Sequence, residues 1–327
     1  MTTYLIRRIL YVIPTFLGAT FLAFMILQAM PGDFLTQLSL DPKIRPETIE
    51  HMRHLFGLDK PVLVQYLIWL KNLFNGDLGY SFMYQQPVLE VILPRIENSL
   101  ILVGLGVLFL YLIGIPVGIY QAVRPYTPGD YVISFLAYFG IAIPNFFFML
   151  ILIFVLVKIK FATGSTPFPI GGMTSQGFEQ FPAWKKALDI LWHAALPAFV
   201  VVTADMSSLT RVMRGLMLEV LGQDFIRTAR AKGLPERVVL YKHALRNAII
   251  PVIATIGGLL PGLIGGAGLV EVVSGWPGMT PLLLDALNRQ DLYVNAGIIA
   301  LSTFLLIIGN IIGDVLLALV DPRIRYG

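Results

Sequence analysis

Long apolar runs, separated by shorter polar segments, dominate the pattern of the chain. An α-helix rises about 1.5 Å per residue, so about twenty apolar residues cross the roughly 30 Å hydrocarbon core of a bilayer. Six runs reach this length, at 9–30, 99–123, 131–157, 191–209, 248–270 and 292–320. Because backbone polar groups inside a bilayer must bond within the protein, we predict an all-α polytopic membrane protein with six transmembrane helices.

The first apolar run follows Arg7 and Arg8, an arrangement that also occurs in secretory signal peptides. The apolar part of a signal peptide usually has about 7–15 residues, and the run 9–30 is longer. We therefore expect an uncleaved N-terminal transmembrane helix within residues 1–30.

The polar segments divide the rest of the chain. Residues 31–98 are predicted to form an external helical segment, and residues 99–320 a five-helix membrane core. The core contains a basic segment at 211–247. Residues 321–327 form a short tail.

Turn-forming residues punctuate the predicted external surface. Within 31–98, the breaks at 57–61 and 75–76 separate two short amphipathic helices. The loop 158–190 is rich in Gly, Pro, Ser and Thr and is long enough to be functional. The loop 271–291 carries a Trp-Pro-Gly turn, which is followed by a predicted short helix.

The placement of lysine and arginine predicts the orientation. Residues 1–8, 124–130, 211–247 and 321–327 carry thirteen of the 24 basic residues but only five of the 20 acidic ones. Cytoplasmic loops of membrane proteins are enriched in Lys and Arg. Both termini are therefore expected in the cytoplasm, as six spans require.

The composition agrees with a membrane protein and excludes several other classes. Hydrophobic residues make up 56% of the chain, and the mean hydropathy is +0.76. The absence of cysteine excludes disulfides, thiolate metal sites and a cysteine nucleophile. The net charge of +4 is spread along the chain, which indicates topology rather than nucleic-acid binding. No Gly-Lys dipeptide occurs, so the chain has no P-loop for ATP.

A basic helix-turn-helix is predicted between the fourth and fifth apolar runs. Asp224 is expected to cap the first helix, because a carboxylate is favoured at the positive helix end. Gly233 permits a sharp turn, and Pro235 fits the first turn of a second helix. A rigid element joined to two membrane helices suits the transmission of a partner's movement. The alternative is that its basic residues only fix the orientation and bind anionic membrane lipid.

Four positions within the apolar runs are candidate pathway residues. Asp205 lies at membrane depth, where it contacts substrate or a gate, or else pairs with Arg211 or a neighbouring subunit. Asn145 follows a proline and marks a kink, whose freed carbonyls face a cavity or are packed. Gly258 and Gly262 belong to a face suited to close helix packing or to a narrow path.

Other polar residues are expected to be structural. Asp314 lies near the inner end of the last run, with Asn310 one turn before it. His51 and His54 share a helix face, but two histidines without a third ligand do not predict a metal site. Asp205 and Asp314 form the one candidate pair for an intramembrane hydrolase, and no hydrolase motif flanks them.

One segment, at 219–253, resembles the cytoplasmic segment that is characteristic of permease subunits in the dipeptide/oligopeptide/nickel family of ABC importers. It reads EVLGQDFIRTARAKGLPERVVLYKHALRNAIIPVI. Further matches are RRILYVIPTFLGATFLAFMILQAMPGD, FGLDKPVLVQYLIWLKNLFNGDLGYSF, GWPGMTPLLLDALNRQD and DVLLALVDPRIRYG. The resemblance covers nearly the whole chain and fits the subunit type with a long external loop after its first span.

The resemblance implies the fold of a type I importer permease in the cell membrane. A homologous sister subunit would complete the pathway, two cytoplasmic ATPases would use ATP and Mg, and an external binding protein would deliver cargo. This chain would be non-catalytic and would bind no cofactor or metal. The residues it implies for ATPase coupling are Asp224, Arg227, Thr228, Ala229, Arg230, Ala231, Lys232, Gly233 and Leu234.

The cargo implied by the resemblance is di- or oligopeptides. Nickel chelates, opines and oligosaccharides stay open, because cargo choice in such systems rests largely with the binding protein. A passive channel or secondary transporter is the rival from another class. Such a transporter needs no basic docking helix, so it would keep its transport when that helix is removed.

Overall fold

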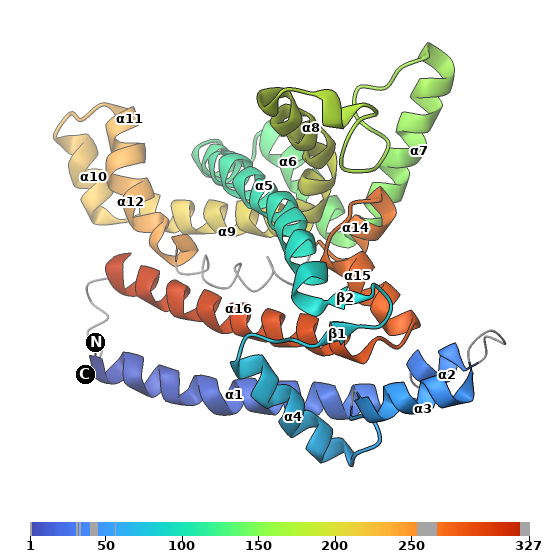
Figure 1. The fold of residues 1–327 in the computed structure, drawn as a ribbon. Helices are drawn as coiled ribbons and strands as arrows, with labels where there is room; N and C mark the ends of the chain where they lie inside the picture. The colour runs from blue at the N-terminus through green and yellow to red at the C-terminus, as the bar shows by residue number, and fades with distance from the viewer. Residues whose placement is uncertain are drawn as a thin grey trace. The chain divides into compact units, whose positions relative to one another are not determined.

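The fold is given by a computed structural model, which describes residues 2–30, 32, 34–39, 45–55, 57–253 and 267–320. Almost every regular element in these residues is a helix (Figure 1). The exception is an antiparallel pair, β1 (Tyr80–Ser81) and β2 (Gln86–Pro87), with Tyr80 opposite Pro87. The predicted all-α class is confirmed.

The helices differ widely in length. The first part of the chain contains α1 (Thr2–Gln28), α2 (Phe34–Leu38), α3 (Pro46–Leu55), α4 (Val62–Phe74) and α5 (Val88–Val123). The middle contains α6 (Pro128–Ala142), α7 (Asn145–Thr163), the 3₁₀-helix η1 (Phe178–Gln180), α8 (Ala183–Val201) and α9 (Thr203–Leu221). The last part contains α10 (Asp224–Ala231), α11 (Glu236–Val238), the π-helix η2 (Val239–Ala244), α12 (Leu245–Ala248), α14 (Leu269–Ser274), α15 (Met279–Asn288) and α16 (Leu292–Val320).

Four helices of the described residues are long and apolar enough to cross a membrane, namely α1, α5, α7 and α16. The bent pair α8 and α9 gives a fifth candidate span. The predicted span 248–270 lies largely outside the described residues, which omit 254–266. The count of six spans therefore stays a prediction.

The third predicted span, 131–157, is not one continuous helix. It is divided into α6 and α7, because Ile143 is extended and Pro144 precedes the first residue of α7. Proline has no N–H to donate and disfavours helical geometry in the residue before it. The kink predicted at Asn145 is therefore confirmed as a full break, and α7 extends to Thr163.

The fourth predicted span, 191–209, is also wrong as a single straight helix. The structure has α8 and α9 instead, bent by 58° at a break between them. Both helices extend well beyond the predicted limits. Pro197 lies within α8 and removes one helical hydrogen-bond donor shortly before the bend.

The helix breaks within residues 31–98 agree with the sequence pattern. The helices α3 and α4 are separated around Gly57, and α4 ends at Phe74, with Asn75 as its C-cap just before Gly76. Both glycines have positive φ, of 67° and 83°, which L side chains rarely adopt. The two predicted short helices are thus confirmed, and so is the helix after the Trp-Pro-Gly turn, which is α15.

The chain divides into two compact units. One unit comprises residues 1–98 and 278–309, with 326–327, and the other comprises 99–277 and 310–325. In the first unit, α1 and α4 pack against α16 through Phe24, Tyr66, Trp69, Ala296 and Ala300. A second cluster there joins the start of α5 to α15 and α16.

The second unit has two apolar clusters of its own. One cluster surrounds the fully buried Trp276 and brings together residues of α5, α7, α8 and α14. The other joins α5 and α9 to the helices that follow α9 along the chain, through Met213, Met217, Ile226 and Val239. This second cluster positions the basic segment.

Candidate functional site

The helix α10 carries the residues predicted for coupling. Its two buried side chains are Ile226 and Ala229, which belong to the cluster that includes Met213 and Met217 of α9. Ala229 therefore packs inward, whereas Arg227 exposes 74% of its side chain. One face of α10 is thus anchored to α9, and the opposite face is basic and open.

Asp224 is not the cap that we predicted. It is the first residue of α10, Gln223 occupies the cap position, and Gln223 makes no side-chain cap bond. The Asp224 carboxylate instead accepts a 3.1 Å hydrogen bond from Arg227 one turn later. It still lies in the first turn, where a negative charge favours the helix.

Gly233 makes the predicted turn. Its φ is +73°, and the backbone N–H groups of Gly233 and Leu234 donate to the carbonyls of Arg230 and Ala229. A Cβ added at Gly233 would have nothing within 4 Å. Glycine is therefore favoured at position 233 because of the positive φ, and not because neighbouring atoms leave no space for a side chain.

An ion pair that the sequence analysis did not predict spans this turn. Arg230 donates from Nη2 to Oε1 of Glu236 at 2.7 Å and from Nε to Oε2 at 3.2 Å. The hydrogen bond from Arg230 holds the pKa of Glu236 below its ordinary value. The opposite charges of Arg230 and Glu236, on the two sides of the Gly-Leu-Pro turn, could have predicted this ion pair from the sequence. The pair is largely exposed and contributes little to stability.

The second helix of the element is composite. Pro235 is the cap before α11 and not part of its first turn, which corrects the prediction by one position. After α11 the chain winds as the π-helix η2 and then as α12. Val239 and Ala244 bury the inner side of η2 in the same cluster as Ile226. Short π segments in proteins often mark functional sites.

Three apolar side chains lie exposed among the basic ones on this element. They are Phe225, Leu234 and Tyr241. We name the exposed residues Phe225, Arg227, Arg230, Lys232, Leu234 and Tyr241 the coupling surface. Its mixture of apolar and basic groups suits contact with a protein better than contact with water alone.

A partly buried ion pair, in which Asp130 is buried and Arg214 is 27% exposed, connects α9 to α6. Asp130, in the first turn of α6, accepts hydrogen bonds from Nη2 of Arg214 at 2.9 Å and from Nε at 3.2 Å. Gln121 and the backbone N–H of Tyr126 also donate to this carboxylate, at 2.9 Å each. The Arg214 hydrogen bond and these donors hold the pKa of Asp130 below its ordinary value. Neither residue was predicted, because 84 positions separate them.

The candidate pathway residues are only partly described. Asp205 is exposed on α9, and no ion pair to it occurs within the described residues. Arg211, one of the alternative partners predicted for Asp205, lies with its guanidinium carbon 5.4 Å from the centre of the Tyr138 ring. Gly258 and Gly262 lie outside the described residues, as does the side chain of Asp314.

Asn145 joins the two broken helices. Its side-chain amide donates a 2.8 Å hydrogen bond to the carbonyl of Val201, the last residue of α8. A cavity of about 380 Å³ lies beside both breaks, between α5, α6 and α9. Its walls are mostly apolar, with hydroxyls from Thr203, Ser207 and Thr210.

The comparisons with known proteins cover the whole chain. A family model described as "binding-protein-dependent transport system inner membrane component" matches residues 114–326, and the corresponding N-terminal model matches 1–103. The chain belongs to this family.

Relatives of this permease extend over its full length. It is 45% identical over 327 residues to the oligopeptide transport system permease protein AppB of Bacillus subtilis, covering 100% of both chains. It is 36% identical over 342 residues to the dipeptide transport system permease protein DppB of Escherichia coli K12, covering 100% of this chain and 99% of that one. The resemblance seen in the sequence is therefore confirmed.

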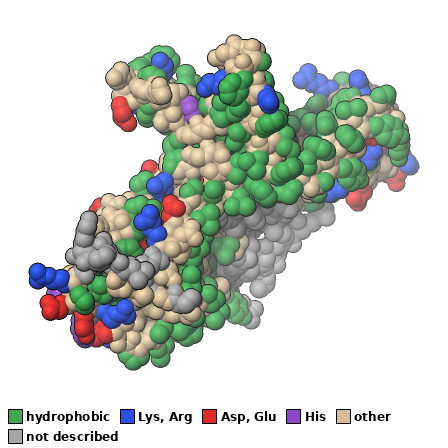
Figure 2. Space-filling view, turned by 90° about the vertical axis from the view of Figure 1, so that its right-hand side faces the viewer, with side chains coloured by type: hydrophobic (Ala, Val, Ile, Leu, Met, Phe, Trp, Pro, Cys, Tyr) green, Lys and Arg blue, Asp and Glu red, His purple; other side chains and the backbone are tan. Residues whose placement is uncertain are grey.

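The permease is a multi-pass membrane protein, as its surface also indicates. In the space-filling view, hydrophobic side chains cover large continuous areas, and charged side chains gather in separate groups (Figure 2). Such apolar areas are unfavourable in water and favourable against lipid or another membrane subunit.

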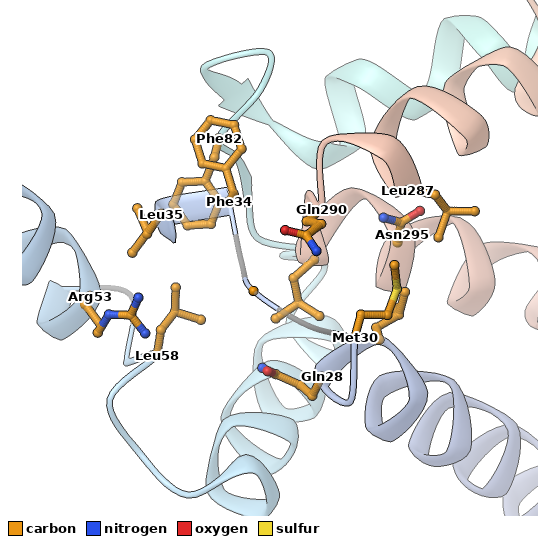
Figure 3. A pocket seen from close by; sticks show the side chains of 13 residues that line it. Gln28, Met30, Phe34, Leu35, Arg53, Leu58, Phe82, Leu287, Gln290 and Asn295 are labelled. Carbon is orange, nitrogen blue, oxygen red and sulfur yellow. The ribbon is translucent and has the colours of Figure 1, made fainter. Parts of the chain in front are cut away.

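A small cavity of about 100 Å³ lies among residues 27–58, Phe82 and residues 287–295 (Figure 3). Arg53 and Gln290 reach it from opposite sides, between apolar side chains such as Phe34 and Leu287. Nearby, Ser81 donates a 2.7 Å hydrogen bond to the buried carboxylate of Asp291. This bond ties the segment after α4 to the loop before α16.

His51 and His54 make no shared contact among the described residues. The Nδ1 atom of His54 lies 2.7 Å from Oδ2 of Asp59, and His51 is exposed. Within the described residues, no group of three His, Asp or Glu side chains is placed to hold a metal ion.

Proposed function

We propose that this chain is the permease subunit of an ATP-driven peptide importer and that the coupling surface binds a cytoplasmic ATPase. The observation that carries the proposal is the construction of α10. Its inner face is fixed to α9 by Ile226, and its outer face presents Phe225 and Arg227, while Leu234 is exposed in the turn that follows. An element held in this way moves with the membrane helices and not independently of them.

The movement of the ATPases would reach the membrane helices in two successive steps. Ile226 and Ala229 transmit it to α9 and α12 through their shared apolar cluster. The Asp130–Arg214 pair then connects α9 to α6. Packed interiors resist deformation, so a displacement at α10 shifts these helices together.

This chain itself would be non-catalytic in the proposed importer. Two partner ATPases would bind ATP and Mg, consistent with the absence of a Gly-Lys dipeptide. A homologous sister subunit would complete the pathway. In this subunit, we propose that the pathway passes along Asp205 and the residues that line the cavity beside the α6–α7 and α8–α9 breaks. Asn145 would hold these two breaks in place.

The external surface would receive the cargo-loaded binding protein. The proposed receiving parts are residues 31–98 and the loops 158–190 and 271–291. This assignment places both termini in the cytoplasm and the chain in the cytoplasmic membrane, in agreement with the distribution of Lys and Arg.

Peptides are the proposed cargo, because AppB and DppB are named as oligopeptide and dipeptide permeases. Nickel chelates, opines and oligosaccharides are the alternative cargoes. Uptake measured with labelled peptides in competition with each alternative, in cells that carry the cognate binding protein, distinguishes them.

The decisive experiment is purification of the chain from detergent-solubilised membranes, with identification of its partners and an ATPase assay. The double variant Arg227→Glu, Arg230→Glu should lose the ATPases while it keeps the sister subunit. Lys60→Glu reverses an exposed charge outside the coupling surface and is the matched control. Recovery of the wild-type chain alone, with intact transport in vesicles, would instead support a passive or secondary transporter.

A further inference from the structure

The helix α4 packs against two candidate membrane spans. Its buried residues, Tyr66 and Trp69, lie in one cluster with Phe24 of α1 and with Ala296 and Ala300 of α16. The rings of Phe24 and Tyr66 have centroids 5.7 Å apart, and those of Phe24 and Trp69 also 5.7 Å. Figure 1 shows α4 lying across α1. The inner face of α4 is therefore covered by α1 and α16.

Polar contacts show how far along α1 this helix reaches. The Tyr66 hydroxyl donates to the carbonyl of Leu17 at 3.2 Å and lies 3.1 Å from the Thr20 hydroxyl. Leu17 precedes Gln28, the last residue of α1, by eleven positions, which corresponds to about 16 Å of helix. Because the apolar part of α1 runs from Tyr11 to Gln28, the contact of Tyr66 with Leu17 lies about two-thirds of the way along it from Gln28.

The opposite face of α4 is mostly apolar, and no described part of the chain covers it. Leu63 exposes 56% of its surface, Leu67 54% and Phe74 73%. Residues at this spacing lie on one side of an α-helix. Lys71 is the single charged residue of α4, and its long side chain can reach the polar region while its stem stays among apolar groups.

The neighbouring helix α3 provides an internal comparison. Its exposed side chains include Glu47, Glu50 and His51, so it presents a polar face. Both helices belong to the same external segment. The difference between their exposed faces therefore indicates different surroundings and not a general property of the segment.

We propose that α4 is embedded in the outer leaflet of the bilayer, with Leu63, Leu67 and Phe74 against lipid acyl chains. With 13 residues the helix is about 20 Å long, too short to cross a hydrocarbon core of about 30 Å. Its contacts with two spans place it at membrane depth, and the charged group on its uncovered face, that of Lys71 in the last turn, can reach the polar region. Lipid is therefore the partner that fits this face, independently of what the permease transports.

Spin labelling tests this placement directly, because the chain has no native cysteine to remove. Leu67→Cys carries a nitroxide on the proposed lipid face of α4. Ile26→Cys, 67% exposed in the wild type on α1, is the lipid reference, and Glu50→Cys on α3 is the water reference. Each variant of the full chain, assembled with its partners in liposomes, is measured for collision with oxygen and with a water-soluble nickel chelate.

The expected result is a ratio of oxygen to nickel collisions at Leu67 that matches Ile26 and exceeds Glu50. Leu63→Cys should repeat it, which guards against a local effect of one label. A ratio at both positions equal to that of Glu50 would place the face in water. Protection from both reagents would mean that another protein subunit covers α4. Either of these two results would overturn the proposal.

Discussion

The side-chain amide of Asn145 donates a 2.8 Å hydrogen bond to the carbonyl of Val201, 56 positions later in the chain. Asn145 begins α7 after the Pro144 break, and Val201 ends α8 before the 58° bend. A broken helix at membrane depth leaves carbonyl groups without helical donors, and these must be satisfied by other protein groups. The two breaks therefore stabilise one another through a single bond.

Removal of this bond should destabilise the protein. We expect Asn145→Ala to lower the free energy of unfolding by roughly 1–3 kcal/mol, because the Val201 carbonyl loses its donor. Thermal unfolding in detergent measures the loss. Asn247→Ala is the matched control, since Asn247 makes the same type of bond, at 2.8 Å to the carbonyl of His243, at an exposed position. Equal effects of the two variants would contradict the role given to Asn145.

The Asp130–Arg214 pair should be sensitive to both mutation and pH. Breaking a buried pair leaves one group without its partner, so Arg214→Met should destabilise the protein by about 3 kcal/mol. The pKa of Asp130 is lower in the folded protein than in the unfolded chain, mainly because of the Arg214 hydrogen bond. Its contribution is therefore present above the unfolded pKa and is lost as pH falls through the folded pKa.

Unfolding temperatures of wild type and Asp130→Asn, measured from neutral pH into the acid range, test this sign. The difference between the two proteins should be full at neutral pH and should shrink only in strong acid. Glu236→Gln provides the comparison with an exposed pair, for which the effect should stay below about 1 kcal/mol. A difference for Asp130→Asn that grows as pH falls would refute the assignment.

Gly233 should tolerate asparagine better than valine. Its positive φ of 73° strains a β-branched residue, at a cost of about 1–3 kcal/mol, whereas Asn adopts this conformation more readily. No neighbour lies within 4 Å of the added Cβ, so crowding does not contribute. We expect Gly233→Val to uncouple ATP hydrolysis from uptake and Gly233→Asn to keep most coupling. Equal uptake per ATP hydrolysed in both variants would show that the turn geometry is unimportant.

Gly118 should be required for the close approach of α5 and α9. A Cβ there would lie 2.7 Å from the Met213 Cβ and 2.7 Å from the Thr210 carbonyl oxygen. We expect Gly118→Ala to destabilise the protein by about 1–3 kcal/mol through overpacking. Gly104→Ala, in the same helix, adds a Cβ with nothing within 4 Å and should cost little. Unfolding in detergent compares the two variants, and similar losses would exclude overpacking as the cause.

The sequence predicted the features that depend on local pattern. The last span begins at Leu292, the helix breaks within residues 31–98 fall at glycines, and the Gly233 turn has the expected conformation. Each of these follows from an apolar run or from a residue with restricted or unusual backbone freedom. The breaks beside Pro144 and near Val202 divide apolar runs that hydropathy alone treats as continuous. A mean hydropathy over a window of residues does not show whether the helix axis bends or breaks within that window.

Contacts between residues far apart along the chain could not be predicted from the sequence pattern. Asp130 looks like an ordinary acidic residue in a first helical turn and Arg214 like an ordinary basic residue of a helix, and only the packing of α6 on α9 brings them together. The same holds for Tyr66, which the pattern assigned to an external amphipathic helix and which bonds to α1. The position of Asp224 was wrong by one residue, since Gln223 takes the cap position although it supplies no side-chain bond.

The π-helix η2, Val239–Ala244, changes how the sequence after it must be aligned. A π turn contains an additional residue compared with an α turn, and each residue rotates an α-helix by about 100°. A helical wheel drawn without interruption from Glu236 to Ala248 therefore assigns the residues after Ala244 to the wrong face. The chain here is one residue longer than a regular helix of the same span requires.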